Sequence, residues 1–288
     1  MSGPELVRPE TLADLVALRA AHPDRTLVAG GTDVMVGVNF GRLRPSGVID
    51  VGRVAELRAH EVVDGVLRIG AGVTFGRIET SLADVVPALA TAARGVGSPQ
   101  IRAAATIGGN LGTASPAGDA HPALIALGAS IELASVDGTR LVPADAYFLG
   151  PGRSVRTERE VVAAVRIPVG DGIRQEFAKI GTRNAMVIAV AAVAVVVDLE
   201  RRRIGVGLGS VGPTPIRAAR AEALLAAALW PDGGERVPPT AETIAAFAEE
   251  VRRSARPIDD VRGTAAYRAH AVQVMARRCA TWCLEEVR

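Results

Sequence analysis

Small residues, hydroxyls and a single carboxylate are gathered in the stretch ATIGGNLGTASPAGD, residues 105–119. Its paired glycines, Gly108 and Gly109, let the backbone approach a ligand closely or adopt positive φ. Thr106, Asn110, Thr113 and Ser115 add short polar side chains that can reach phosphate or sugar oxygens. The stretch therefore has the chemistry of a loop that holds a phosphorylated ligand.

Asp119 does not suit a phosphate-binding loop, because its carboxylate would repel a phosphate directly. A carboxylate suits a ribityl or ribose hydroxyl instead, since it can accept the hydrogen bond that the hydroxyl donates. The alternative is that Asp119 or Ser115 only caps a helix expected over residues 120–127.

A second small-residue stretch is LVAGGTDVM, residues 27–35, in which a strand runs through Gly30 and Gly31 into a helix start near Asp33. Unpaired backbone N–H groups and the helix dipole at such a junction favour phosphate. An ordinary glycine turn capped by Asp33 is the alternative. Neither stretch carries a GxGxxG or GK[ST] signature. Together they predict a ligand with two phosphates, and a dinucleotide is the simplest one.

Composition excludes several other functions. The net charge is only +2, the arginines are scattered, and aromatic residues make up 3%, which argues against nucleic acid and anionic membranes. The only cysteines, Cys279 and Cys283, lie four residues apart and predict two reduced thiols on a packed helix. The longest apolar run, residues 185–197, is too short to span a bilayer. We therefore expect a cytoplasmic protein without a transmembrane segment.

Lys179 is the only lysine of the chain, and the other basic residues are all arginine. A lysine offers a compact point charge that the planar arginine fork cannot imitate. Lys179 is therefore a candidate for a specific role.

The patterning predicts an α+β chain in which the two small-residue stretches lie between strands and helices. Helical spacing over residues 10–21, strands at 26–29 and 46–51, and a helix from Asp33 predict a small α/β unit. Further on, Thr74 predicts the cap of a helix over 75–82, Asp137-Gly138 a hairpin turn, and 160–168 a strand.

A new pattern begins near residue 175. It predicts three strands, 175–181, 185–198 and one near 202–212, followed by helices over 217–229, 240–253 and the C-terminal segment. We therefore expect a first domain over 1–174, with subdomains of about 1–55 and 56–174. A second domain over 175–288 is expected to pair a three-stranded antiparallel sheet with helices.

The combination of motifs resembles the FAD-binding medium subunit of the xanthine dehydrogenase and carbon monoxide dehydrogenase family of molybdenum hydroxylases. AGGTD, residues 29–33, resembles the first FAD loop of that family and residues 105–119 its second. The likeness continues through LGPGRSVRTEREVVAAVRIP, EFAKIGTRNAMVIAVAAVAV, GSVGPTPIRAARAEALL and RPIDDVRGTAAYRAH, so it spans nearly the whole chain. The resemblance implies a two-subdomain FAD-binding domain like that of vanillyl-alcohol oxidase, followed by the C-terminal domain of that family.

The resemblance also implies FAD-binding positions. The FAD-contacting residues that it implies are Ala29, Gly30, Gly31, Thr32, Asp33, Val34, Met35, Thr106, Gly109, Asn110, Thr113, Ser115, Asp119, Val162 and Lys179. Within this set it places the first loop on the pyrophosphate and Lys179 near the edge of the flavin. Val96 stands where xanthine dehydrogenases have an aromatic ring, and Phe75 where relatives have a small polar residue or His. No His or Cys is placed to bind the flavin covalently, so the implied FAD is non-covalent.

The implied function is electron transfer within a complex. A large partner subunit would hold molybdopterin and a small one two [2Fe–2S] clusters, in a dimer of heterotrimers that allows peripheral contact with the inner face of the membrane. Electrons would pass from the clusters through FAD to a quinone, NAD or dioxygen. The alternative is a stand-alone FAD-dependent oxidoreductase with its own small substrate.

Overall fold

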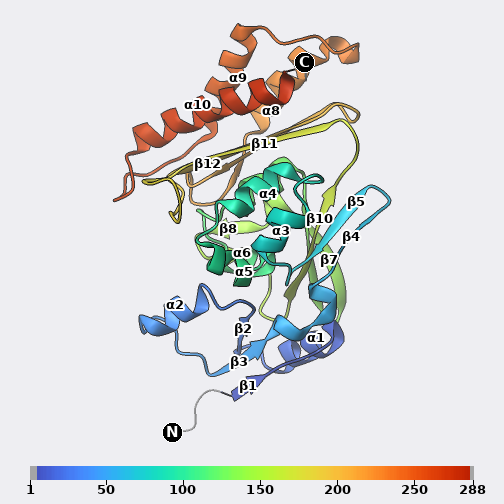
Figure 1. Cartoon of the computed structure of the whole chain (residues 1–288), viewed down its shortest axis with the longest axis vertical. Helices are drawn as coiled ribbons and strands as arrows, with labels where there is room; N and C mark the ends of the chain where they lie inside the picture. Colours follow the sequence, from blue (N-terminus) through green and yellow to red (C-terminus); the bar gives the residue numbers. More distant parts are fainter. Residues whose placement is uncertain (1–4, 286–288) are drawn as a thin grey trace.

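Three sheets are stacked along the long axis of the molecule, with helices between and outside them (Figure 1). The computed structural model describes residues 5–285. The sheet nearest the N-terminus is parallel, in the order β1-β3-β2. The elements of this N-terminal unit are β1 (Glu5–Val7), α1 (Leu12–Ala21), β2 (Thr26–Val28), α2 (Val34–Asn39), β3 (Gly47–Asp50) and the 3₁₀ turns η1 (Val51–Arg53) and η2 (Ala55–Leu57).

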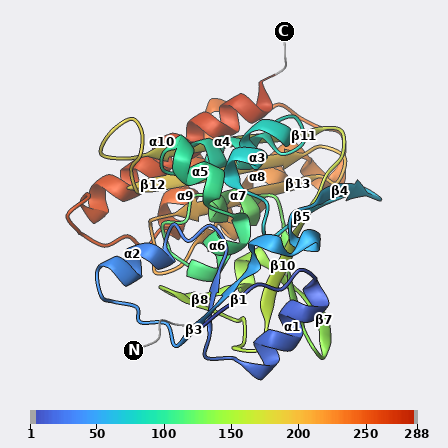
Figure 2. The ribbon, with the colours of Figure 1, turned by 60° about the horizontal axis from the view of Figure 1, so that its bottom comes forward.

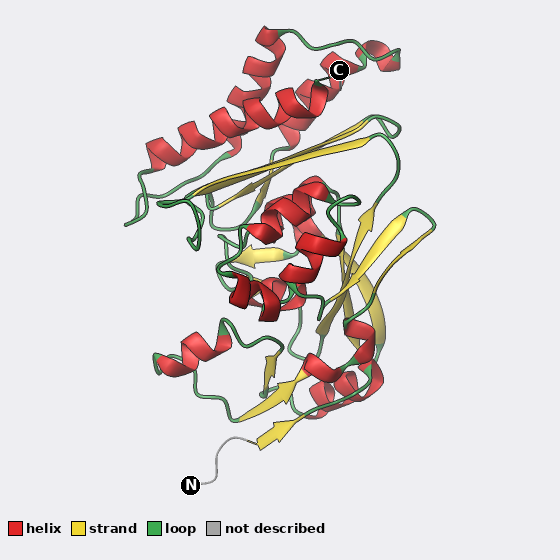
Figure 3. Ribbon diagram, in the orientation of Figure 1, coloured by secondary structure: helices red, strands yellow, loops and turns green. Residues whose placement is uncertain are grey.

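The middle unit is built on a five-stranded antiparallel sheet, in the order β4-β5-β10-β6-β7. Its strands are β4 (His60–Val63), β5 (Val66–Gly70), β6 (Ser130–Ser135), β7 (Gly138–Pro143), β10 (Val161–Pro168) and the separate pair β8 (Phe148–Gly150) and β9 (Arg153–Ser154). Its helices are α3 (Phe75–Ser81), α4 (Pro87–Arg94), α5 (Pro99–Ala104), α6 (Ile107–Thr113), α7 (Ala120–Ala126) and η3 (Ala144–Ala146). Figures 2 and 3 show these helices clustered between the middle sheet and the C-terminal one.

The C-terminal unit is an antiparallel sheet in the order β11-β12-β13-β14, covered on its outer face by long helices (Figure 3). Its elements are β11 (Ile173–Ile180), β12 (Ala191–Asp198), β13 (Arg203–Gly209), β14 (Ile216–Arg217), α8 (Ala219–Leu229), η4 (Pro231–Gly233), α9 (Ala241–Ser254) and α10 (Ala265–Leu284). The α+β class is confirmed. The sheet has a short fourth strand, β14, beyond the three that the sequence predicted.

Strand β12 explains the long apolar run in the sequence. Side chains alternate between the two faces of a strand, and both faces of β12 are buried. Ala192, Ala194 and Val196 pack into the core that the N-terminal and middle units share, whereas Val193 and Val195 pack against the C-terminal helices. A strand buried on both sides needs apolar residues at every position, so its sequence shows no alternation.

Two expectations are corrected by the structure. The strand predicted over 185–198 begins only at Ala191, because Arg183 donates to the carbonyl oxygens of Ala185 and Met186 and closes residues 181–190 into a loop. The stretch 105–119, expected as a loop, contains the helix α6. The Thr106 hydroxyl caps this helix by accepting from the Gly109 N–H at 3.0 Å.

Two glycines let α7 lie directly on β13. A Cβ on Gly205 would collide with the carbonyl oxygen of Ala126, and one on Gly207 with that of Pro122. Because α7 begins directly after Asp119, these glycines set the distance between the C-terminal sheet and the second small-residue stretch.

We expect Gly207→Ala to lower the free energy of unfolding by about 1–3 kcal/mol, because the added methyl overpacks the contact between α7 and β13. Urea denaturation measures this loss. Gly150→Ala is the matched control, since nothing lies within 4 Å of a Cβ added there. Equal stabilities of the two variants would contradict this account of the packing.

Candidate functional site

A cleft of about 720 Å³ lies between the N-terminal unit and the helices of the middle unit. Both small-residue stretches line it, together with Val162 of β10 and the loop residues Met186, Val187 and Ile188. All the site residues expected from the sequence line this cleft except Met35 and Lys179. Met35 is half-exposed on α2, and Lys179 lies behind the cleft wall.

The first stretch is held in place by close contact with the second. Gly30 packs so tightly on the backbone of Ala104 that a Cβ there would collide with the carbonyl oxygen. Gly31 has a φ of 69°, a conformation that glycine adopts without strain. The Thr113 hydroxyl lies 3.3 Å from Asp33 Oδ2 and joins the two stretches across the cleft. Asp33 stands at the N-cap position of α2, as the alternative expected, but its side chain makes no capping hydrogen bond there.

Two residues of the second stretch that line the cleft carry buried acceptor atoms. Asn110 Oδ1 and Asp119 Oδ1 have no hydrogen-bond partner among the described residues. Both residues line the cleft, and Asp119 makes no side-chain cap to α7. Buried polar atoms without partners are costly, so these two oxygens are matched to a ligand that donates hydrogen bonds.

The other oxygen of Asp119 is paired with the only lysine. Lys179 Nζ lies 2.7 Å from Asp119 Oδ2 and 3.0 Å from the carbonyl oxygen of Gly95, and both side chains are almost buried. Burial raises the pKa of the Asp119 carboxyl, and the adjacent Lys179 ammonium opposes that rise. The lysine therefore holds the carboxylate in position rather than lining the cleft itself.

Three arginines line the cleft that were not predicted as site residues. Arg19, Arg25 and Arg156 line it together with Leu15 and Leu27. Arg19 is 6% exposed, and burial and the nearby Arg156 lower the pKa of its guanidinium. The sequence held one indication that Arg19 is buried: it stands four residues after Leu15 and therefore lies on the same, buried face of the helix. Val96 and Phe75, the two departures from the family pattern, also line the cleft.

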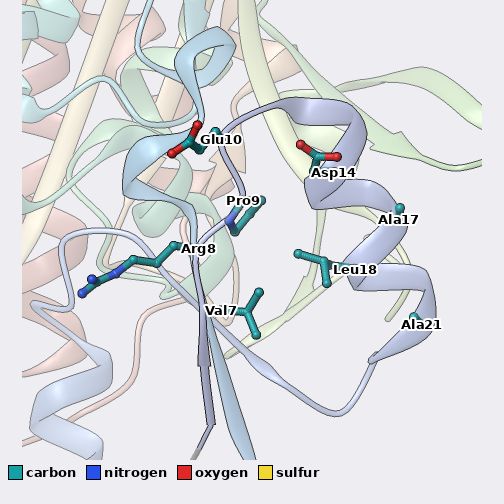
Figure 4. Close-up of a pocket in the computed structure, with 8 residues that line it drawn as sticks. All are labelled: Val7, Arg8, Pro9, Glu10, Asp14, Ala17, Leu18 and Ala21. Carbon is teal, nitrogen blue, oxygen red and sulfur yellow. The ribbon is translucent and has the colours of Figure 1, made fainter.

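A second depression, of about 560 Å³, lies beside α1 and is lined by Val7, Arg8, Pro9, Glu10, Asp14, Ala17, Leu18 and Ala21 (Figure 4). Two of its charged groups are already paired within the chain. Arg8 bonds Asp50 at 3.0 Å, and Asp14 accepts from the Thr11 hydroxyl at 2.7 Å. Asn110 Oδ1 and Asp119 Oδ1 have no such partner among the described residues, so the larger cleft is the candidate site.

The cysteines take no part in the cleft. Cys279 and Cys283 are buried free thiols on α10, as expected, and burial raises the pKa of Cys279 to about 12. Within residues 5–285, no three His, Cys, Asp or Glu side chains come together as a metal site. In the same part of the chain, none of the helices combines the length and apolarity needed to cross a membrane.

Two family models match consecutive parts of the chain. Residues 2–170 match the FAD binding domain in molybdopterin dehydrogenase, and residues 176–283 match the CO dehydrogenase flavoprotein C-terminal domain. The xanthine dehydrogenase FAD-binding subunit of Escherichia coli O157:H7 is 31% identical, over 94% of this chain and 92% of that protein. The carbon monoxide dehydrogenase medium chain of Hydrogenophaga pseudoflava is 30% identical, over 95% of each chain.

A solved carbon monoxide dehydrogenase from Hydrogenophaga pseudoflava, which lacks the Mo-pyranopterin moiety of its molybdenum cofactor, has the same fold. Its matching chain superposes with a TM-score of 0.87 at 29% identity, over 99% of both chains. Fold and cleft thus define a flavin-nucleotide-binding oxidoreductase subunit. The chain belongs to the FAD-binding medium subunits of the molybdenum hydroxylase family, and its cofactor is FAD.

The cleft suits FAD on its own chemistry. The unpartnered oxygens of Asn110 and Asp119 match the hydroxyl and N–H donors of the cofactor. The nearby glycines leave room for the cofactor to come close to the protein backbone. Gly112, for example, has nothing within 4 Å of an added Cβ and lines the cleft.

His121 supports the loop that carries the cleft residues Ser115 and Asp119. Its Nδ1 lies 3.1 Å from the carbonyl oxygen of Ser115, and its ring packs on Phe148 with centroids 4.5 Å apart. The side chain is fully buried, and desolvation lowers its pKa from 6.5 to about 4. The folded chain therefore holds this imidazole neutral.

We expect stability to fall as the pH is lowered from 6.5 to 4, because the unfolded chain then binds a proton at His121 that the folded chain does not. The free energy of unfolding that is lost through this group reaches about 3 kcal/mol. His121→Leu flattens this dependence in urea denaturation at several pH values, whereas Phe148→Leu lowers stability equally at every pH. A His121→Leu curve parallel to that of the wild type would contradict the assignment.

Proposed function

We propose that this chain transfers electrons from [2Fe–2S] clusters on a small partner subunit to an external acceptor, within a complex whose large subunit holds molybdopterin. The observation that carries the proposal is the FAD cleft, formed by two interlocked small-residue stretches. Relatives named as medium chains of carbon monoxide dehydrogenase and nicotine 6-hydroxylase support the placement in a complex. The acceptor is a quinone, NAD or dioxygen, and a cytoplasmic location remains a prediction.

The residues of the cleft have positioning roles in this proposal. The N–H groups of residues 29–34 and the hydroxyls of Thr32 and Thr113 hold the pyrophosphate, whereas the Met35 N–H is already donated to the carbonyl oxygen of Gly31. Thr106 shapes the second stretch by capping α6, while Gly109, Asn110, Ser115 and Val162 line the remainder of the cofactor. Asp119 accepts from a ribityl or ribose hydroxyl, and Lys179 fixes its orientation.

FAD, when bound, accepts electrons one at a time and releases them in pairs. The proposal needs no acid–base group for a substrate reaction: among the described cleft residues there is no His, Cys, Tyr or Glu, and the two carboxylates are engaged, Asp119 with Lys179 and Asp33 with the Thr113 hydroxyl. This favours electron transfer over a stand-alone oxidoreductase. We also propose that the chain divides into domains at residues 174 and 175, close to the gap between the two family matches.

The test of this function is a comparison of the purified complex with the isolated chain. In the complex, the substrate of the large subunit should bleach the flavin absorbance in stopped-flow measurements. The isolated FAD-loaded chain should remain oxidised in the presence of the same substrate. Turnover of a small substrate by the isolated chain with dioxygen would overturn the electron-transfer proposal.

We expect Asp119→Ala to weaken FAD binding by roughly 10- to 150-fold, since a hydrogen bond to a charged group contributes about 1.5–3 kcal/mol. Titration of the apoprotein with FAD, followed by flavin fluorescence, measures the dissociation constant. Asp137→Ala, at an exposed hairpin turn, is the matched control. Unchanged FAD affinity in Asp119→Ala would break the assignment of this carboxylate.

A further inference from the structure

Two arginines of the FAD cleft carry charges that no carboxylate of the described chain neutralises. Arg19 stands on α1 of the N-terminal unit, and Arg156 stands between β9 and β10 of the middle unit. Both line the cleft. Neither forms a salt bridge within residues 5–285, although the neighbouring Arg25 pairs with Glu5 at 2.6 Å. Each of the two units therefore contributes one unpaired cation to the cleft.

Arg19 is the more buried of the two. Its Nη1 donates to the carbonyl oxygen of Arg25 at 2.7 Å, whereas its buried Nε has no hydrogen-bond partner among the described residues. Burial lowers the pKa of the Arg19 guanidinium, and the positive charge of Arg156 lowers it further. A buried donor without an acceptor is costly, so the Nε of Arg19 is matched to a ligand that accepts hydrogen bonds.

Arg156 is held in place by the loop that precedes β10. Its guanidinium donates to the carbonyl oxygens of Thr157 and Glu160, at 3.2 and 2.9 Å. The Glu160 carboxylate pairs with Arg140 at 2.6 Å and accepts from the Thr157 N–H at 2.7 Å. Because Glu160 is engaged by Arg140, it fixes the loop without neutralising Arg156. The loop therefore holds a cation ready for a ligand.

The Arg19 contact lies at the opposite end of β2 from the loop that we assign to the pyrophosphate. Arg25, whose carbonyl oxygen accepts from Arg19, precedes β2, whereas residues 29–34 follow it. A strand of three residues spans about 10 Å. The part of the cleft beside Arg19 is therefore left for a portion of the cofactor other than its phosphates.

The two parts of the cleft differ in their hydrogen-bonding character. The second stretch offers the unpartnered acceptors Asn110 Oδ1 and Asp119 Oδ1, which match the several hydroxyls of the ribityl chain. The guanidinium of Arg19 offers only donors, beside the apolar side chains of Leu15 and Leu27. Adenosine fits such a place, because its ring nitrogens and ribose oxygens accept hydrogen bonds and its flat base covers apolar surface.

We propose that Arg19 and Arg156 bind the adenosine portion of FAD and thereby select the dinucleotide over flavin mononucleotide (FMN). A planar guanidinium can stack on the base as well as donate to its edge. The pyrophosphate next to the adenosine supplies the negative charge that offsets the two cations. Because one arginine comes from each unit, the adenosine also joins the N-terminal unit to the middle unit. This assignment rests on FAD as the cofactor and not on the partner subunits.

The competing occupant of the arginines is the pyrophosphate, since guanidinium groups also bind phosphate oxygens well. The proposal favours adenosine because Arg19 lies among apolar side chains at the start of β2, whereas the glycine-rich stretch lies at its end. The two occupants are distinguished by ligands that contain only one of the two groups.

The experiment uses the full-length chain, freed of flavin, and three variants. Arg19→Met and Arg156→Met each remove one charge and its donors but keep an unbranched side chain. Arg53→Met is the matched control, because Arg53 is exposed in the N-terminal unit and does not line the cleft. Dissociation constants are measured for FAD and FMN by flavin fluorescence, and for ADP and inorganic pyrophosphate by isothermal titration calorimetry. Circular dichroism checks that each variant is folded.

We expect Arg19→Met and Arg156→Met to weaken FAD and ADP binding about tenfold or more, with FMN and pyrophosphate within about twofold of the wild type, since each variant loses hydrogen bonds from a charged group. Arg53→Met should change none of the four constants. If Arg19→Met does not fold, the half-buried Arg156 decides the outcome through its own variant.

Three results would overturn the proposal. Weaker binding of pyrophosphate and FMN in the variants would assign the arginines to the phosphates. Weaker binding of FMN with unchanged ADP would assign them to the flavin end. Unchanged FAD affinity in the folded variants, or a wild-type chain that binds FMN as tightly as FAD, would show that the two arginines select nothing.

Discussion

The ion pair between Lys179 and Asp119 joins the C-terminal sheet to the wall of the FAD cleft. Lys179 stands on β11, Asp119 directly before α7, and the same ammonium also binds the carbonyl oxygen that ends α4. Two charges removed from water must remain paired, because breaking such a pair costs about 3–5 kcal/mol. The strand and both helices are therefore held in one relative position, and the second oxygen of Asp119 has no hydrogen-bond partner among the described residues.

The doubly buried strand β12 extends this constraint through the molecule. One face of β12 belongs to the core of the FAD-binding part and the other to the C-terminal helices, so the sheet cannot shift without opening both cores. The loop 181–190 connects β11 to β12 and is thus presented at the mouth of the cleft by a rigid support. Arg268 holds the base of that loop through the Val190 carbonyl.

The cleft combines polar groups that match a cofactor with the positively charged side chains of Arg19 and Arg156. A subunit that relays electrons needs such a cleft and no substrate pocket of its own, because the flavin supplies the redox chemistry.

The sequence by itself determined the fold class, the two small-residue stretches and the choice of Lys179 as a candidate residue. The glycine patterns, the apolar patterning of helices and strands and the presence of a single lysine can all be seen in the chain. The sequence pattern predicted too early a start for β12, because the Arg183 contacts hold apolar residues in a loop. It also predicted a loop where α6 lies, because the Thr106 cap stabilises a helix in a glycine-rich segment. Only the tertiary structure showed that Lys179 binds Asp119 and that Arg19 lines the cleft. These are contacts between residues far apart in sequence, and only the packing of the sheets and helices brings such residues together.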